Sequence, residues 1–414
     1  MRELYIIITG RLDHIGGSEL YTLRRIKYLQ NRGFGTLVIT SSFKKEEVLL
    51  KELENFNIIE LKNIQYNEKK YINRLENNLK DQYKKIYIET HCFWEFGEKL
   101  AQRLKTINFI YLMAEQPFFN FPNKRFFLEK LKSDEIIGVS EETLRISFGE
   151  EWNKGNYKNN YVNISFDKEE IQSDKNREKI YKLEKNEENI RILTVSRFEK
   201  TYIEELIKDV LKISKKYKNK SFELILIGDS SNREIRLNLI EKYKNTSNLK
   251  IRFLGYITPL FSELYENLDL FVGMGTALIN AVSFECISLG IDARNNRTSG
   301  FFGRDIKTFG YHSSDKTTSI FEKIEEFILM KKEEKDQIKK KSKKLYEENF
   351  GFLNTMQKLD SYILNEEKYK KITYTMPKRE YKYYIKIILF KLKVLNILLK
   401  IKNKIKPNKK FVNL

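Results

Sequence analysis

The stretch "LDLFVGMGTALINAVSFECISLGID", from Leu268 to Asp292, joins a strand-like run, a glycine turn and an apolar helix. Its first seven residues are mostly apolar, and the two glycines at their end permit a tight turn. The run that follows predicts a helix packed in a core, with Ala277, Ala281 and Glu285 on one face. A carboxylate in such company needs either solvent or a polar partner. The stretch therefore predicts a strand–turn–helix unit and leaves open what Glu285 does there.

The same alternation of apolar strands and longer helical runs extends along most of the chain. The strand runs are continuously apolar, which is typical of parallel strands buried on both faces. Continuous strands separated by helices predict open α/β sheets with helices on both sides. The predicted strands include Leu4–Gly10, Thr36–Thr40, Lys85–Thr90, Asn108–Ala114 and Asp134–Ser140, and then Ile190–Ser196, Phe222–Asp229, Lys250–Tyr256 and Leu268–Met274.

A charged segment with little strand character separates two such series and predicts a linker. We expect two Rossmann-like, doubly wound α/β domains at residues 1–165 and 190–340, joined by residues 166–189. Residues 341–370 are expected to form a helix that crosses back to the first domain, and residues 371–414 a basic tail. Open α/β sheets bind ligands beyond the carboxyl ends of their strands, so two of them in tandem predict a cleft lined by those ends.

The net charge of +20 favours an anionic partner, and most of it lies in the tail. Residues 371–414 hold thirteen Lys or Arg and one Glu, so they carry +12 of the total. Within residues 378–410, lysines flank an apolar stripe of Tyr384, Ile388, Leu395 and Leu399. This pattern predicts an amphipathic helical tail on an anionic membrane surface, with a helix packed on the protein body or a partner as the alternative.

Other features exclude several classes of protein. The tail is too aliphatic for a nucleic-acid arm, and no basic–aromatic sheet motif accompanies it. No run reaches the roughly eighteen apolar residues of a membrane span. The N-terminus lacks a signal-peptide pattern. Two distant cysteines, Cys92 and Cys286, suit a reducing compartment. We expect a cytoplasmic protein, peripheral on the inner face of the cell membrane.

Three loops that follow predicted strands carry residues suited to binding an anion. Gly16 and Gly17 precede the first long helix, where backbone amides can approach a phosphate or sugar. Arg197 and Lys200 in "SRFEK" follow the first strand of the second series, and both can hold a diphosphate. Gly228 marks a third loop, in "GDSSNR". Each loop is also compatible with an ordinary turn.

Taken together, these motifs resemble family 4 of the retaining nucleotide-sugar glycosyltransferases, which have the GT-B fold. The resemblance extends to about residue 365 and is strongest from Arg191 to Gly290. There, motifs that are loose individually follow the family's order and spacing. It implies a transferase that takes a sugar from a nucleotide-diphosphate donor, without a cofactor. No Asp-x-Asp motif stands at a strand end, in keeping with a metal-independent, hexosyl-transferring enzyme of this kind.

The resemblance also implies roles for individual residues. Glu285 takes the place of the second of two family glutamates, which binds the ribose hydroxyls. Arg197 and Lys200 fall on the basic pair that neutralises the diphosphate, with Gly228 in a loop that faces the cleft. Gly16 and Gly17 fall on the loop that approaches donor phosphate and acceptor.

The first family glutamate falls on Ala277, and this is the main departure from the pattern. Its loss leaves the donor sugar to the backbone amides of Thr276–Ile279, which include those of Ala277 and Leu278, or to another residue. His91 is the counterpart, by location, of a family histidine near the donor sugar, and Glu115 is its rival as a catalytic residue.

A membrane-bound transferase suits a lipid-linked glycan acceptor in the synthesis of bacterial surface polysaccharide. The alternative is a catalytically degenerate GT-B protein that serves as a membrane-bound scaffold in a polysaccharide assembly complex. Ala277 favours the scaffold, whereas the retained Arg197, Lys200 and Glu285 favour the enzyme.

Overall fold

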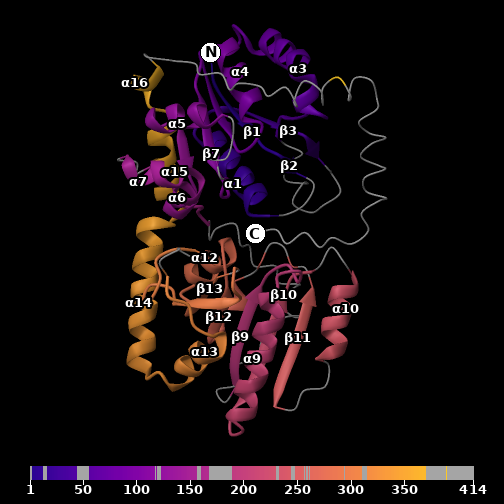
Figure 1. Cartoon of the computed structure of the whole chain (residues 1–414), viewed down its shortest axis with the longest axis vertical. Helices are drawn as coiled ribbons and strands as arrows, with labels where there is room; N and C mark the ends of the chain where they lie inside the picture. The colour runs from indigo at the N-terminus through magenta and orange to yellow at the C-terminus, as the bar shows by residue number, and fades with distance from the viewer. Residues whose placement is uncertain are drawn as a thin grey trace. The chain divides into compact units, whose positions relative to one another are not determined.

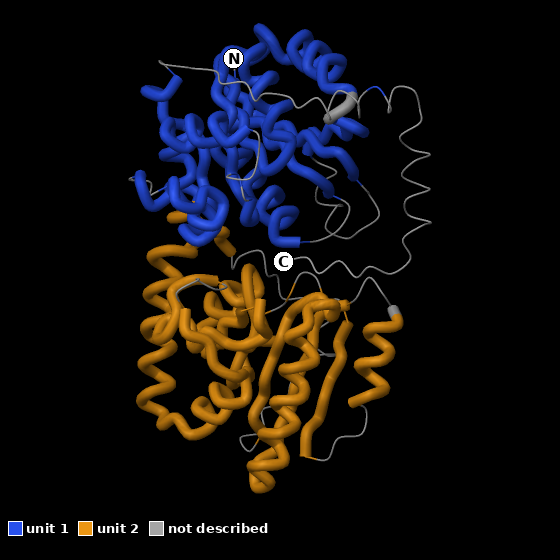
Figure 2. The backbone as a smooth tube through the Cα atoms, in the orientation of Figure 1, with its two compact units in different colours: residues 1–163, 356–414 blue, residues 164–355 orange. Residues whose placement is uncertain are grey.

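The computed structural model divides the chain into two compact units (Figures 1 and 2). Unit 1 comprises residues 1–163 and 356–414, and unit 2 comprises residues 164–355. Most of the predicted linker and of the predicted basic tail lies outside the described residues. The structure describes residues 2–12, 16–43, 56–116, 118, 123–155, 160–166, 189–229, 233–243, 248–255, 257, 260, 262–292, 294–309, 315–369 and 388.

Unit 1 is built on a six-stranded parallel sheet with the strand order β5-β3-β1-β6-β7-β8. Its first strand pairs in parallel with β3 and β6, with Ile8 opposite Ile39 and Thr90. A separate two-stranded sheet of β2 and β4 follows β1 and β3. The strands are β1 (Glu3–Ile8), β2 (Arg11–Leu12), β3 (Gly35–Thr40), β4 (Ser42–Phe43), β5 (Ile58–Glu60), β6 (Lys85–Thr90), β7 (Asn108–Leu112) and β8 (Ile136–Gly138).

Successive β1 side chains point to opposite faces of the sheet. Helices cover each of these faces. Ile6 packs in a core with Leu75 and Leu100, whereas Tyr5 faces Arg25. The helices of this part of the unit are α1 (Gly17–Asn31), α3 (Ile64–Leu79), α4 (Trp94–Leu104), α5 (Lys124–Lys132), α6 (Glu141–Phe148) and α7 (Glu150–Lys154).

Unit 2 repeats the plan with the strand order β11-β10-β9-β12-β13-β14, in which only the edge strand β14 is antiparallel. The sheet lies between two cores: Leu224 and Leu226 of β10 pack in one, and Ile225 and Ile227 in the other. The strands are β9 (Asn189–Val195), β10 (Ser221–Ile227), β11 (Leu249–Gly255), β12 (Leu270–Gly273), β13 (Ser288–Asp292) and β14 (Arg297–Phe301).

The helices of unit 2 divide between these cores. α9 (Tyr202–Lys216) and α13 (Ile320–Leu329) contribute to the first, and α12 (Thr276–Ser283) to the second. Figure 1 shows α9 along β9, β10 and β11. The others are α10 (Arg233–Lys242), α11 (Glu263–Glu266) and α14 (Lys332–Asn349). The predicted fold class, two α/β units with parallel sheets covered on both faces, is confirmed for the described residues.

The chain returns to unit 1 through α15 and α16. α15 (Phe352–Ile363) begins before the boundary at residue 355 and ends beyond it, and α16 (Glu366–Tyr369) follows. Tyr369 packs edge-on against Tyr87 of β6, with ring centroids 5.5 Å apart. Residues 356–369 therefore complete the fold of unit 1.

The stretch from Leu268 to Asp292 forms the predicted strand and turn, and a helix that is shorter than predicted. Because α12 ends at Ser283, Glu285 lies outside the helix, and the predicted alignment of Glu285 with Ala277 and Ala281 on one helix face is wrong. Glu285 adopts a left-handed conformation with φ of 63°. The chain turns there so that the next residues can enter β13, which the sequence patterns did not predict.

Candidate active site

The loop after β9 presents two basic side chains on a fixed backbone. The amide of Ser196 donates to the carbonyl of Ile227 at 2.9 Å, and the amide of Phe198 to that of Asp229 at 3.0 Å. Phe198 is buried, so the loop is anchored on both sides of Arg197. Arg197 is exposed and Lys200 half-buried. Neither side chain makes an ion pair with any residue that the structure describes.

The charges of Arg197 and Lys200 act on one another. Partial burial lowers the pKa of Lys200, and the positive charge of Arg197 lowers it further. Two like charges with no described carboxylate to balance them favour an anionic ligand, which would relieve the repulsion.

Gly228 supports this loop from the neighbouring strand. It follows β10 with φ of 139°, and its amide donates to the carbonyl of Gly255 at 2.8 Å. A Cβ atom at this position would lie 1.9 Å from the carbonyl oxygen of Ser196. Glycine is therefore required for the close approach of the two strand ends, and Gly228 shapes the loop that carries Arg197.

The N-terminus of α12 follows the strand next to β9. Gly275 precedes the helix with φ of 65°, and its amide donates to the carbonyl of Phe309. The amides of Leu278 and Ile279 donate to the carbonyl of Gly275 at 3.2 and 3.3 Å. The two amides before them, of Thr276 and Ala277, are the ones that the helix itself leaves without an acceptor.

The predicted contact of the donor with the Leu278 amide stays a prediction, and the structure shows the surroundings of that residue. The amide of Leu278 has an acceptor within the turn, and its side chain is fully buried. The Leu278 side chain therefore belongs to the core of the unit. The two free amide positions are those of Thr276 and Ala277, where the helix dipole also favours an anion.

Glu285 stands away from this edge of the sheet. Its carboxylate forms an ion pair with Lys343 of α14 at 2.7 Å, and both side chains are about half exposed. α12 has eight residues and spans roughly 12 Å, with Thr276 at its start and Glu285 beyond its end. The question left open by the sequence has a structural answer, because Glu285 has both solvent and a polar partner.

Asn280 is a polar residue of α12 that the sequence analysis did not single out. It is 6 % exposed, and its Oδ1 atom has no hydrogen-bond partner within the described part of the chain. Side chains on a helix lean toward its N-terminus, so Asn280 leans over the turn that contains Thr276 and Ala277. The signal in the sequence was weak, since an isolated Asn between apolar residues is common.

These residues gather at one edge of unit 2. β10, β9 and β12 are adjacent and parallel, so their carboxyl ends lie at the same edge of the sheet. Arg197 and Lys200 follow β9, Gly228 follows β10, and Thr276 and Ala277 follow β12. The fold thus brings together five of the predicted donor-binding residues and leaves Glu285 outside the group.

In unit 1 the remaining predicted residues follow carboxyl strand ends. Gly16 is the N-cap of α1 and Gly17 its first residue. The backbone of Gly16 is extended, which any residue can adopt, and its carbonyl accepts from the amide of Leu20 at 3.1 Å. Glu115 lies exposed in the loop after β7.

His91 follows β6, and both its ring nitrogens are engaged. Nε2 lies 2.8 Å from Oε1 of Glu89, and Nδ1 lies 3.3 Å from Oγ1 of Thr9. The His91 side chain is 4 % exposed and Glu89 is fully buried. His91 is therefore held in place by contacts at both ring nitrogens.

Two features are absent from the described part of the chain. No group of three or more His, Cys, Asp or Glu side chains is placed there to hold a metal ion. No helix in the same ranges is long and apolar enough to cross a membrane.

Known structures share the fold over nearly the whole chain. HepE from Anabaena, solved in complex with UDP, matches with a TM-score of 0.60 and 13% identity over 88% of this chain and 100% of that one. The lipopolysaccharide outer core galactosyltransferase WaaB, in its apo form, matches with a TM-score of 0.55 and 12% identity over 87% and 99%. The UDP-GlcNAc 2-epimerase from Neisseria meningitidis, bound to UDP-GlcNAc, matches with a TM-score of 0.54 and 15% identity over 87% and 100%.

At these identities the structural matches show the fold alone, and an epimerase is among them. No curated protein sequence matches the chain significantly. The activity class comes from the sequence of unit 2, because residues 175–345 match the family described as "Glycosyl transferases group 1". Residues 175–345 therefore resemble the group 1 glycosyltransferases in sequence, and the chain shares the fold of HepE and WaaB along most of its length.

Proposed function

We propose that the protein transfers a sugar, a hexose by resemblance, from a nucleotide-diphosphate donor to a glycan acceptor, and that unit 2 binds the donor. The observation that carries the proposal is the gathering of Arg197, Lys200 and the α12 N-terminus at one sheet edge. HepE, which shares the fold, was solved with UDP and with UDP-glucose. A nucleoside diphosphate is the chemistry that such an edge recognises.

Arg197 and Lys200 would hold the diphosphate. Negative charge grows on this leaving group as the bond to the sugar breaks, so cations already fixed beside it stabilise the transition state more than the ground state. Arg197 supplies a planar fork and Lys200 a point charge. The amides of Thr276 and Ala277 would bind phosphate or sugar oxygens at the helix N-terminus.

The hydroxyls of the nucleoside need an acceptor, and two residues compete for that role. The family resemblance assigns it to Glu285, whose carboxylate is already paired with Lys343. Asn280 offers a buried amide oxygen without a described partner, closer along α12 to the proposed phosphate site. We assign the hydroxyl contact to Asn280 and keep Glu285 as the rival that mutation decides.

The finer parts of the proposal rest on the sequence. The resemblance supports a retaining, metal-independent reaction without a cofactor, with the Gly16–Gly17 loop and either His91 or Glu115 on the acceptor side. The basic, apolar composition of residues 378–410 supports attachment to the inner face of the membrane. A lipid-linked acceptor in bacterial surface polysaccharide synthesis would follow from that location.

The proposal is tested by thermal unfolding with a panel of nucleoside diphosphates and their sugars. A ligand that binds only the folded state raises the melting temperature. We expect a rise with at least one nucleotide, lost in Arg197→Ala and Lys200→Ala. The matched control is Arg125→Ala, which removes an exposed arginine paired with Glu129 in unit 1 and should leave the rise intact.

The second candidate function is the catalytically degenerate scaffold, and Ala277 favours it. The position that carries the first family glutamate has no carboxylate, and Glu285 is occupied by a surface ion pair. Absence of binding to every nucleotide, in a protein that unfolds cooperatively, would replace the transferase by the scaffold. Binding without release or transfer of the sugar would also support the scaffold.

A further inference from the structure

Glu89 is a buried carboxylate in unit 1 that lies within hydrogen-bond distance of three side chains. The Tyr5 hydroxyl donates to Oε2 at 2.5 Å, and the Tyr21 hydroxyl donates to Oε1 at 2.7 Å. His91 Nε2 lies 2.8 Å from Oε1 as well. Glu89 is fully buried, so an ionised carboxylate there depends on these partners.

Burial alone would raise the pKa of Glu89. The hydrogen bonds of His91 and Tyr5 and the charge of Arg25 act against that effect and hold the pKa of Glu89 below its ordinary value of 4.5. Glu89 is therefore ionised at neutral pH and acts only as an acceptor.

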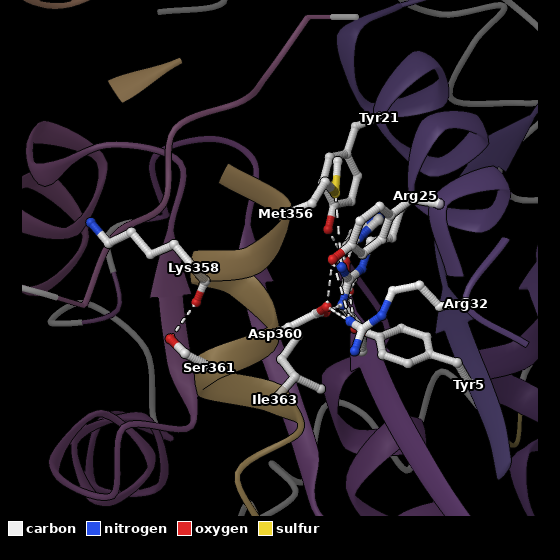
Figure 3. A network of polar contacts seen from close by, with 12 residues as sticks. Tyr5, Tyr21, Arg25, Arg32, Met356, Lys358, Asp360, Ser361 and Ile363 are labelled. Atoms are coloured by element: carbon white, nitrogen blue, oxygen red, sulfur yellow. Dashed lines mark hydrogen bonds and ion pairs between the residues drawn. The ribbon is translucent and has the colours of Figure 1, made fainter. Parts of the chain in front are cut away.

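Arg25 forms ion pairs with both Glu89 and Asp360. Arg25 is fully buried, with Nε 3.7 Å from Glu89 and Nη2 2.6 Å from Asp360 on α15. Its Nη2 atom also donates to the Tyr5 hydroxyl at 3.0 Å. Asp360 accepts from Tyr28 at 2.9 Å and pairs with Arg32. Figure 3 shows Asp360 pointing from α15 toward Arg25 and Arg32.

This arrangement decides which nitrogen of His91 carries the proton. An ionised Glu89 only accepts, so the proton of a neutral imidazole lies on Nε2. Nδ1 is then an acceptor, at 3.3 Å from the Thr9 hydroxyl. Thr9 and His91 follow the adjacent strands β1 and β6, at the carboxyl edge of the sheet.

We propose that Glu89 is a positioning residue that fixes His91 in the Nε2–H tautomer, with Arg25 and Asp360 holding Glu89 in place. The Nδ1 lone pair of His91 is thereby presented to a hydroxyl group, either that of Thr9 or, in exchange, that of a sugar substrate. The part of this inference that concerns substrate rests on the proposed function, whereas the tautomer does not.

Side chains from four parts of unit 1 face His91. From β1 it faces Thr9 and from β6 Glu89, while Tyr21 of α1 and Tyr111 of β7 lie edge-on to it, with ring centroids 5.4 and 6.2 Å away. Arg25 and Arg32 balance Glu89 and Asp360 in charge.

The test is nuclear magnetic resonance of the 414-residue chain labelled with nitrogen-15 in histidine. The sequence has three histidines, and the signals of His91 are those that disappear in His91→Gln. At neutral pH we expect the long-range proton–nitrogen pattern of an Nε2–H imidazole. An Nδ1–H pattern or an imidazolium in the wild-type protein would overturn the inference without any variant.

Glu89→Gln should move both ring nitrogens toward averaged shifts, because the amide no longer enforces one tautomer. Tyr21→Phe is the matched control, since it removes a donor from the same oxygen but keeps the charge, and His91 should stay in the Nε2–H form. If Glu89→Gln does not fold, Glu89→Asp replaces it and should keep the tautomer. A wild-type spectrum in Glu89→Gln would contradict the inference.

Measurements of kcat and KM show whether Glu89 positions His91 for the reaction or only stabilises the fold. With the nucleotide sugar found by thermal unfolding, we expect kcat of Glu89→Gln to fall roughly 10- to 100-fold, with KM for the donor changed less than roughly threefold. Partial recovery of kcat in Glu89→Asp would support positioning. Unchanged kcat would limit Glu89 to stability. Failure of the wild-type protein to bind any nucleotide would overturn the proposed function and leave the spectra to decide the tautomer.

Discussion

Glu285 and Lys343 form an ion pair at 2.7 Å between the turn after α12 and the surface of α14. This is the contact of a half-exposed salt bridge, which typically contributes between zero and about 1 kcal/mol to stability. The carboxylate that looked out of place in an apolar helix is thus a surface group in a left-handed turn. Asn280 is a buried polar side chain inside α12, closer along the helix to Thr276 than Glu285 is.

Paired substitutions of these two residues locate the contact with the nucleoside. We expect Glu285→Ala to change the free energy of unfolding by less than about 1 kcal/mol and to leave nucleotide affinity unchanged. Asn280→Ala should weaken nucleotide binding roughly tenfold, as loss of one hydrogen bond to a ligand hydroxyl would do. Titration calorimetry measures both. The reverse result, with affinity lost in Glu285→Ala alone, would return the role to Glu285.

The depressed pKa of Lys200 predicts a pH dependence of donor binding. Burial and the charge of Arg197 lower that pKa, and a bound diphosphate favours the charged form, so binding should raise it again. Affinity is then fullest at pH values below the pKa of Lys200 in the free protein. It should fall as the pH rises from there through the pKa in the complex.

Lys200→Arg is the control for this dependence, because arginine stays charged over the whole range. The nucleotide affinity of Lys200→Arg should not change over the pH range in which that of the wild-type protein declines. Nucleotide affinity measured by calorimetry at increasing pH decides the matter, and a parallel decline in both proteins would mean that another group titrates.

Gly228→Ala should distort the neighbouring loop that carries Arg197. The added Cβ atom would meet the Ser196 carbonyl at 1.9 Å in a backbone conformation with φ of 139°. We expect a loss of about 2 kcal/mol or more in the free energy of unfolding. Nucleotide affinity should fall as well, because the end of β9 must move.

Gly255→Ala is its control. Gly255 also has a positive φ, of 70°, but nothing lies within 4 Å of an added Cβ. It should cost only about 1 kcal/mol and leave nucleotide binding intact. Chemical denaturation measures both variants, and equal effects would argue against the close approach of Gly228 to Ser196.

The sequence predicted the features that depend on local pattern. Continuous apolar runs and glycine turns gave the strands, and the strand ends gave the loops of Arg197, Lys200 and Thr276. Glu285 was misplaced because periodicity continues past Ser283, while the end of α12 is set by the need to enter β13. Pairings such as Asp360 with Arg25 join residues hundreds of positions apart, which no local pattern reveals.

Asp360 should be a strong contributor to the stability of unit 1. It pairs with the fully buried Arg25, so its removal leaves a buried guanidinium with one carboxylate fewer. We expect Asp360→Ala to cost about 3 kcal/mol of the free energy of unfolding. Asp336→Ala, at an exposed position of α14, should cost less than about 0.5 kcal/mol. Equal denaturation midpoints for the two variants would show that α15 is not held through this pair.

Glu89 should make unit 1 sensitive to acid in a defined direction. Its pKa is lower in the folded protein than its ordinary value of 4.5, so the unfolded chain binds the proton more readily. The stability that Glu89 contributes is therefore complete above that ordinary value and is lost as the pH falls through the folded pKa.

Since other carboxylates titrate in the same range, the informative quantity is the difference in unfolding free energy between the wild-type protein and Glu89→Gln. We expect this difference, from denaturation at a series of pH values, to be constant near neutrality and to shrink on acidification below 4.5. A difference that does not vary with pH would mean that Glu89 is already protonated in the folded protein, and that its contacts with Tyr5, Tyr21 and His91 are those of a neutral acid.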